Sequence, residues 1–97
     1  HHKLPMLTIM HNNRAYHMEV MYLQHVAGVR GRGTDRMHIG TTFRDPYIDY
    51  AKIAAGYGMK SEGPISDPNE LHAALERGVN TVLNGEPYLI DVISQPR

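Results

Sequence analysis

The chain has 97 residues, enough for one small domain, and 41% of them are hydrophobic, so a packed core is expected rather than disorder throughout. Its 10 basic and 10 acidic side chains balance, and no apolar run could cross a bilayer, so neither nucleic acid nor a membrane is an expected partner. The absence of cysteine excludes disulfides, thiolate metal sites and thiolate nucleophiles, and is consistent with a cytoplasmic location.

The first predicted element is a strand at residues 4–10, a nearly continuous apolar run typical of parallel sheets that are covered on both faces. Turn-forming residues at 11–14 end it. A helix is expected at residues 16–29, closed by Gly28. Its apolar stripe, spaced three and four residues apart, consists of Met18, Met21, Tyr22, His25 and Val26.

Residues 28–44 contain four glycines, four arginines and no clear periodicity, which predicts a long mobile loop. The loop is either simply solvated or a lid over an active site. Its arginines raise the alternative of RNA binding, but Phe43 is the one aromatic residue nearby and Asp35 dilutes the positive charge.

Two further helices follow, each opened by Asp-Pro. Asp45 is expected to cap the first, with Pro46 in its first turn and Gly56 and Gly58 at its end. Its expected buried side is Tyr47, Ile48, Ala51, Ala54 and Ala55. A short strand is predicted at residues 59–62.

The second Asp-Pro helix is expected to start at Asp67, with Glu70 in a capping box, and to stop at Asn84 and Gly85. Its apolar stripe comprises Leu71, Ala74, Leu75, Val79, Val82 and Leu83. Residues 87–93 form the last strand, apolar enough to be internal.

The alternation of strands and helices predicts an α/β fold with a partial, doubly wound parallel sheet. The first and the last predicted strand are both apolar enough to be buried on two faces, so we expect neighbouring strands outside this chain.

The chemistry is expected where the first strand ends, because ligands of open α/β sheets bind beyond the carboxyl ends of the strands. Asn12 and Asn13 stand there, directly before a helix N-terminus whose free N–H groups favour a phosphate. Amide and carbonyl oxygens are the hard ligands that Mg²⁺ prefers. The residues alone allow either a metal–diphosphate cradle or a plain turn.

The segment LTIMHNNRAYHMEVM resembles the Asn-Asn end of the thiamine diphosphate motif, which starts with Gly-Asp-Gly in enzymes of the pyruvate decarboxylase and acetolactate synthase type. The following DPYIDYAKIAAGYGMKSEGPISDPNELHAALERGVNTVLNGEPYLIDV resembles the tail of the same cofactor domain. Residues 1–97 are thus similar to the C-terminal part of that domain, and its Gly-Asp-Gly half is expected in the upstream remainder of the enzyme or in a complementary chain.

The resemblance implies thiamine diphosphate and Mg²⁺ as cofactors. The Asn13 side-chain oxygen and the Ala15 carbonyl would ligate the metal, and Asn12 would hold the loop. Tyr16 and the helix start, with His17, would flank the diphosphate, although many relatives carry glycine or threonine where His17 stands.

Glu19 stands six residues after the implied metal ligand, where the decarboxylase branch of the family has a glutamate that faces the reacting carbon of the cofactor. The synthase branch typically has an aliphatic residue there. Glu19 would then donate or accept a proton after decarboxylation. A glutamate in a first helical turn also interacts favourably with the helix dipole, and both roles can hold together.

The resemblance therefore implies a lyase or transferase that makes or breaks the C–C bond next to the carbonyl of a 2-oxo acid or related substrate. It also implies that the chain is competent only within a longer protein, which we expect to form a homo-oligomer. The alternative is a non-catalytic α/β interaction or regulatory domain that kept the fold. The histidines lack the spacing of a compact metal site, and contact of His17 or His38 with substrate stays open.

Overall fold

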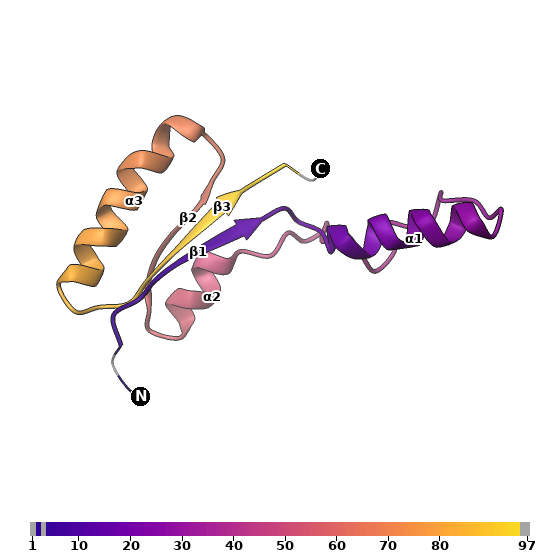
Figure 1. Ribbon diagram of the computed structural model, residues 1–97. Coiled ribbons are helices and arrows are strands. Elements are labelled where there is room, and N and C mark those ends of the chain that lie inside the picture. Colours follow the sequence, from indigo (N-terminus) through magenta and orange to yellow (C-terminus); the bar gives the residue numbers. More distant parts are fainter. Residues whose placement is uncertain (1, 3, 96–97) are drawn as a thin grey trace. The chain divides into compact units, whose positions relative to one another are not determined.

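The computed structural model describes residues 2 and 4–95, so His1 and the last two positions of the expected domain lie outside the described residues. The described chain contains three helices and three strands in the order βααβαβ (Figure 1). In chain order they are β1 (Leu7–Asn12), α1 (His17–Val29), α2 (Tyr50–Gly56), β2 (Lys60–Ile65), α3 (Pro68–Leu83) and β3 (Tyr88–Ile93).

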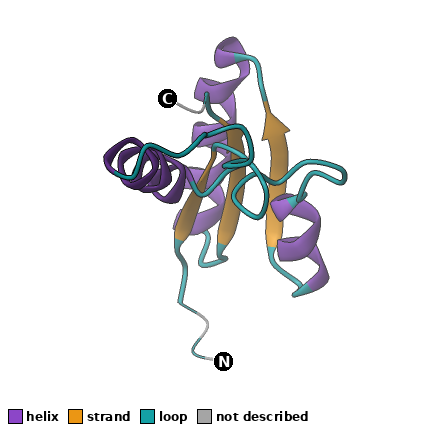
Figure 2. Ribbon diagram, turned by 90° about the vertical axis from the view of Figure 1, so that its right-hand side faces the viewer, coloured by secondary structure: helices purple, strands orange, loops and turns teal. Residues whose placement is uncertain are grey.

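The strands form one parallel sheet in the order β1-β3-β2, so β3 is the central strand (Figure 2). β1 pairs with β3 in continuous register from Leu7 opposite Tyr88 to Asn12 opposite Ile93. The predicted α/β fold with a partial parallel sheet is confirmed, as is the internal position of the last strand. Within the described residues β1 is an edge strand, and the neighbouring strand expected for it outside this chain stays a prediction.

The described chain divides into two compact units. The sheet unit contains the residues up to Asn12 and Asp49–Ser94, and the loop unit contains Asn13–Ile48 with Gln95. The sheet unit therefore holds all three strands with α2 and α3, whereas the loop unit holds α1 and the long segment that follows it.

The core lies between the sheet and α3. Tyr88 and Ile90 point from β3 toward α3, where Ala74 is fully buried and Gly78 lets the helix approach the sheet. Side chains of a strand alternate between its two faces, so Asp91 points to the opposite face, which α2 covers (Figure 1). Asp91 is the one charged side chain among the described residues that is fully buried.

The ends of α3 follow the predicted signals. The Asp67 side chain accepts a hydrogen bond from the Asn69 N–H at 2.9 Å, Pro68 occupies the first helical position, and Gly85 takes a positive φ after the C-terminus. Ala74 and Gly78 are its buried residues, while Val79 and Leu83 of the predicted stripe are exposed.

The predicted start of α2 is wrong. Asp45 does not cap a helix; it adopts a φ of 48°, and α2 begins only at Tyr50. The cap is Asp49, whose carboxylate accepts a hydrogen bond from the Lys52 N–H at 2.9 Å, and this bond lowers the pKa of Asp49. Ala51 and Ala54 are buried as expected, whereas Tyr47 and Ala55 are exposed.

The bounds of two strands and the residue expected to close α1 differ from expectation, whereas the end of α1 at Val29 is as predicted. β1 runs from Leu7 to Asn12 rather than over residues 4–10, because Asn12 stays in the ladder opposite β3. β2 is longer than residues 59–62. α1 continues through Gly28 to Val29, and Gly31, with a φ of 60°, follows its end.

The apolar stripe predicted for α1 is not buried, since none of the helix's 13 residues is buried. Met18 is 74% exposed and Tyr22 67% exposed.

β2 approaches β3 most closely at Gly63, within a register shift between Glu62 and Ile65. Gly63 has a φ of 125°, and a Cβ there would stand 2.5 Å from the Asp91 carbonyl oxygen and 2.9 Å from its Cβ. Only glycine allows both the backbone angle and the approach. Gly63 thus sets the distance between β2 and the buried aspartate.

Replacement of Gly63 by alanine should destabilise the sheet unit more than the same replacement of Gly58. Both positions have a positive φ, so both variants strain the backbone by about 1–2 kcal/mol. At Gly58 a Cβ meets nothing within 4 Å, whereas at Gly63 it collides with Asp91. Urea denaturation should show a loss of about 3 kcal/mol or more for Gly63→Ala and about 1 kcal/mol for Gly58→Ala. Equal losses would contradict the close approach.

Candidate functional site

The loop between β1 and α1 is shaped by Asn13. Its side-chain oxygen accepts a hydrogen bond from the Ala15 N–H at 3.1 Å, so the amide turns back over its own backbone. Arg14, between them, adopts a left-handed φ of 57°. The turn fixes the direction of the Asn13 amide oxygen, which keeps a second lone pair for another partner.

Residues 41–43 hold this loop in place within the loop unit. Tyr16 donates its N–H to the Thr41 carbonyl at 2.7 Å, and Phe43 donates its N–H to the Arg14 carbonyl at 2.8 Å. The two bonds flank an antiparallel bridge between Ala15 and Thr42. No donor to the Ala15 carbonyl oxygen is found among the described residues, so that oxygen remains available to a ligand.

Two aromatic contacts reinforce the same pairing. The Tyr16 and Phe43 rings meet edge to face with centroids 4.7 Å apart. The Arg14 guanidinium lies 3.9 Å from the centroid of the Tyr47 ring, a cation–π contact. The segment after α1 is therefore packed against the loop before α1, although it contains no helix or strand until Tyr50.

The start of α1 presents free backbone donors. Tyr16 is the N-cap, no described side chain caps the helix, and the first bond runs from the Val20 N–H to the Tyr16 carbonyl. The N–H groups of His17, Met18 and Glu19 are therefore left for an anion or for water. Glu19 lies in this first turn with an exposed side chain, and lines an apolar hollow with Met18, Tyr22 and Leu23.

Asn12 belongs to the sheet unit and is 4% exposed. Its side-chain amide donates to Asp91 Oδ1 at 3.0 Å, and its carbonyl accepts from the Ser94 N–H at 2.9 Å. The side chain of Asn12 is thus occupied inside the sheet unit.

The chain matches the model of one protein family over residues 1–92, the family described as "Thiamine pyrophosphate enzyme, C-terminal TPP binding domain". The chain belongs to this family. A search of curated proteins and a search of solved structures each found no match. Thiamine pyrophosphate is thiamine diphosphate, and domains of this family bind it, which confirms the predicted cofactor.

We call the loop between β1 and α1, residues 13–16, the TPP loop. Together with the start of α1 it offers a donor set that fits a diphosphate with a hard metal ion. An oriented amide oxygen at Asn13, an available carbonyl at Ala15 and a helix start with free N–H groups are the partners that Mg²⁺ and phosphate oxygens take. A search for three or more His, Cys, Asp or Glu side chains that could hold a metal found no such group in the described part of the chain. The oxygens that the described residues could offer a metal here are therefore those of amide and carbonyl groups.

The structure brings Asn13, Ala15, Tyr16, His17 and Glu19 together in one short stretch of the loop unit. Sequence reasoning missed the supporting residues Thr41, Phe43 and Tyr47, which lie far along the chain and carry no local signal. It also missed Asp91, for which a signal existed: a carboxylate in the middle of an otherwise apolar internal strand.

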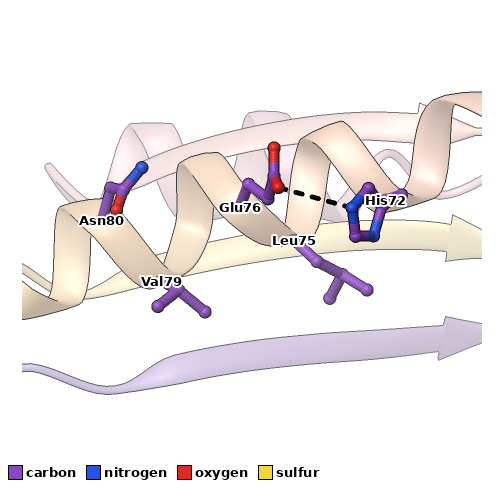
Figure 3. A pocket seen from close by; sticks show the side chains of 5 residues that line it. All are labelled: His72, Leu75, Glu76, Val79 and Asn80. Atoms are coloured by element: carbon purple, nitrogen blue, oxygen red, sulfur yellow. Dashed lines mark ion pairs between the residues drawn. The ribbon is translucent and has the colours of Figure 1, made fainter.

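A hollow on α3 is a poor candidate for a TPP site. Its lining side chains all project from one helix, as Figure 3 shows: His72, Leu75, Glu76, Val79 and Asn80. His72 and Glu76 are one turn apart, with Nε2 and Oε1 separated by 3.3 Å, and both are exposed. Such a pair is a surface contact of the helix.

Among the described residues, no helix is both long and apolar enough to span a membrane.

Loss of the Tyr47 ring should loosen the segment after α1. A cation–π contact contributes about 0.5–1 kcal/mol, so Tyr47→Ala should raise the rate of tryptic cleavage within residues 30–44 about two- to fivefold. Tyr57→Ala is the control, because Tyr57 is 88% exposed and lies in the other unit. An unchanged cleavage rate for Tyr47→Ala would show that the contact does not hold the segment.

Proposed function

We propose that the TPP loop of this chain binds the diphosphate of the cofactor through Mg²⁺, with Asn13 and Ala15 as the metal ligands that this chain supplies. The carrying observation is the hydrogen bond from the Ala15 N–H to Asn13 Oδ1, which orients the amide oxygen close to the Ala15 backbone. The available Ala15 carbonyl supports the same assignment. Tyr16, His17 and the free N–H groups of the α1 start would contact the diphosphate.

The reaction we propose makes or breaks the C–C bond next to the carbonyl of a 2-oxo acid or related substrate, in an enzyme of the acetolactate synthase or decarboxylase type. Bound thiamine diphosphate supplies an electron sink for that bond. Glu19, exposed in the first turn of α1, would donate a proton from its carboxyl group to the substrate-derived carbon, or remove one. Its position favours proton handling of the decarboxylase kind.

We further propose that other parts of the same enzyme, or a second copy of it in a homo-oligomer, cover α1. The support is the exposure of the helix: no residue of it is buried, and Met18 and Tyr22 are largely open. A monomeric surface rarely leaves such a cluster of large apolar side chains uncovered.

A cytoplasmic location is kept as a prediction that rests on the lack of cysteine.

Asn13→Ala should abolish magnesium-dependent retention of thiamine diphosphate. Removal of a group that only hydrogen-bonds to a metal ligand already weakens metal affinity about 10- to 100-fold. Loss of a direct ligand should weaken that affinity at least as much. Titration calorimetry of the full-length protein with thiamine diphosphate, with and without Mg²⁺, measures the effect. Asn13→Asp keeps an oxygen ligand and should retain binding, and Asn80→Ala on exposed α3 is the matched control.

Unchanged affinity in Asn13→Ala would contradict the metal site. Absence of any cofactor binding by the unsubstituted protein would instead favour the alternative, a non-catalytic interaction or regulatory domain that retains the fold.

Glu19→Gln should lower kcat with little effect on cofactor binding, because the amide cannot exchange the proton. A fall of about 100-fold or more is expected, since general acid–base catalysis typically contributes about that much. Carbon dioxide release from pyruvate, used as the probe 2-oxo acid, measures kcat. Glu76→Gln is the control, an exposed helix glutamate on α3. An unaltered kcat in Glu19→Gln would contradict the proposed proton transfer. Glu19 would then act only through its favourable interaction with the helix dipole.

A further inference from the structure

Asp91 accepts two hydrogen bonds from residues far apart in the sequence. Its Oδ1 receives the Asn12 side-chain amide at 3.0 Å, and its Oδ2 receives the Tyr50 N–H at 3.3 Å. We call Asp91, Asn12 and Tyr50 the Asp91 junction. It joins the carboxyl end of β1, the central strand β3 and the first residue of α2, all within the sheet unit.

The Asp91 junction is buried and in close contact with neighbouring backbone. Asp91 is 0% exposed and Asn12 is 4% exposed, so neither group can exchange its partner for water. Gly63 brings β2 against the Asp91 backbone, and the Ser94 N–H holds the Asn12 carbonyl. A carboxylate enclosed in this way has little room to move, and so defines where its two donors stand.

The two donors mark where the chain leaves and rejoins the sheet unit. Asn12 is the last residue of β1 before the loop unit begins at Asn13, and Tyr50 is the first residue of α2 after that unit ends. One carboxylate therefore holds both ends of the segment that contains α1 and the TPP loop. Fixing the ends of a long segment removes much of its conformational freedom.

We propose that Asp91 is a positioning residue for the TPP loop, which we also call the cofactor loop. It acts through Asn12, whose peptide bond to Asn13 makes any displacement of Asn12 a displacement of the metal ligand's backbone. Through Tyr50 it holds the other end of the segment whose residues 41–43 pair with the loop. The inference rests on the proposed role of Asn13, and extends it to a residue that touches neither metal nor cofactor.

The isosteric variant Asp91→Asn tests this role. An amide at position 91 has one oxygen and one NH₂ group, so it cannot accept from both Asn12 and Tyr50 as they stand. Either one donor faces another donor, or the Asn12 amide turns over and gives up its present orientation. The double variant Asn12→Asp/Asp91→Asn exchanges the two groups. The amide at position 91 then donates to the carboxylate at position 12, and its oxygen still accepts from Tyr50. A residue with a merely structural role elsewhere would not be rescued by this exchange. Asp67→Asn, at the exposed cap of α3, is the control for the chemical change.

Two measurements on the full-length protein separate positioning from function. In the cofactor-free protein, Asp91→Asn should raise tryptic cleavage within residues 30–44 about tenfold, the change expected when one buried hydrogen bond is lost. In magnesium buffer, calorimetry should show thiamine diphosphate bound about tenfold more weakly. The double variant should recover most of both changes, and Asp67→Asn should alter neither.

Cleavage and affinity that stay unchanged in Asp91→Asn would overturn the proposal, as would a double variant no better than Asp91→Asn alone. Cleavage is measured without cofactor, so it shows whether the Asp91 junction holds the ends of the segment even where the unsubstituted protein fails to bind thiamine diphosphate. In that case the proposed function fails, and positioning of the cofactor loop fails with it, whatever the cleavage shows about the segment's ends. Where the protein binds the cofactor, faster cleavage with unaltered affinity would also refute a role in positioning.

Discussion

The carboxylate of Asp91 ties together three elements that are remote in the sequence, and the arrangement of the sheet unit depends on it. A charged group in the middle of a central strand is costly to bury unless donors surround it. Here the donors are the Asn12 amide and the Tyr50 N–H. Satisfying Asp91 therefore requires β1 to extend as far as Asn12 and α2 to begin at Tyr50, and it requires glycine at position 63, where β2 passes over the same residue.

That requirement explains which boundaries the sequence could predict. α3 was predicted almost to the residue, because Asp67, Pro68 and Gly85 act locally. α2 was misplaced because Asp45-Pro46 imitates the same signal, while the true cap, Asp49, lies close to the end that Asp91 holds. β1 was ended too early because asparagine favours turns, yet Asn12 is kept in the ladder by a partner 79 positions away. Local propensity contains no information on that partner.

The candidate site likewise has a local part that the sequence could predict and a part formed by remote contacts that it could not. The turn at Asn13 is a local structure, formed with the Ala15 N–H, and its residue types alone identified it as a possible cradle for a metal and a diphosphate. The family match over residues 1–92 supplies the cofactor, thiamine diphosphate. The contacts that shape the loop from outside, from Thr41, Phe43 and Tyr47, come from a segment without periodicity, which sequence analysis could describe only as a loop or a lid.

The exposure of α1 has a thermodynamic consequence. A helix of 13 residues is only marginally stable in water from its own hydrogen bonds, and most helices in proteins gain stability by burying one face. No face of α1 is buried, so the fraction of molecules in which it is formed depends on what covers it. A ligand that needs the N–H groups at its start binds with an apparent affinity scaled by that fraction. Under the proposed cover of α1 by other parts of the enzyme or a second copy, assembly and cofactor affinity are thermodynamically linked, and each should strengthen the other.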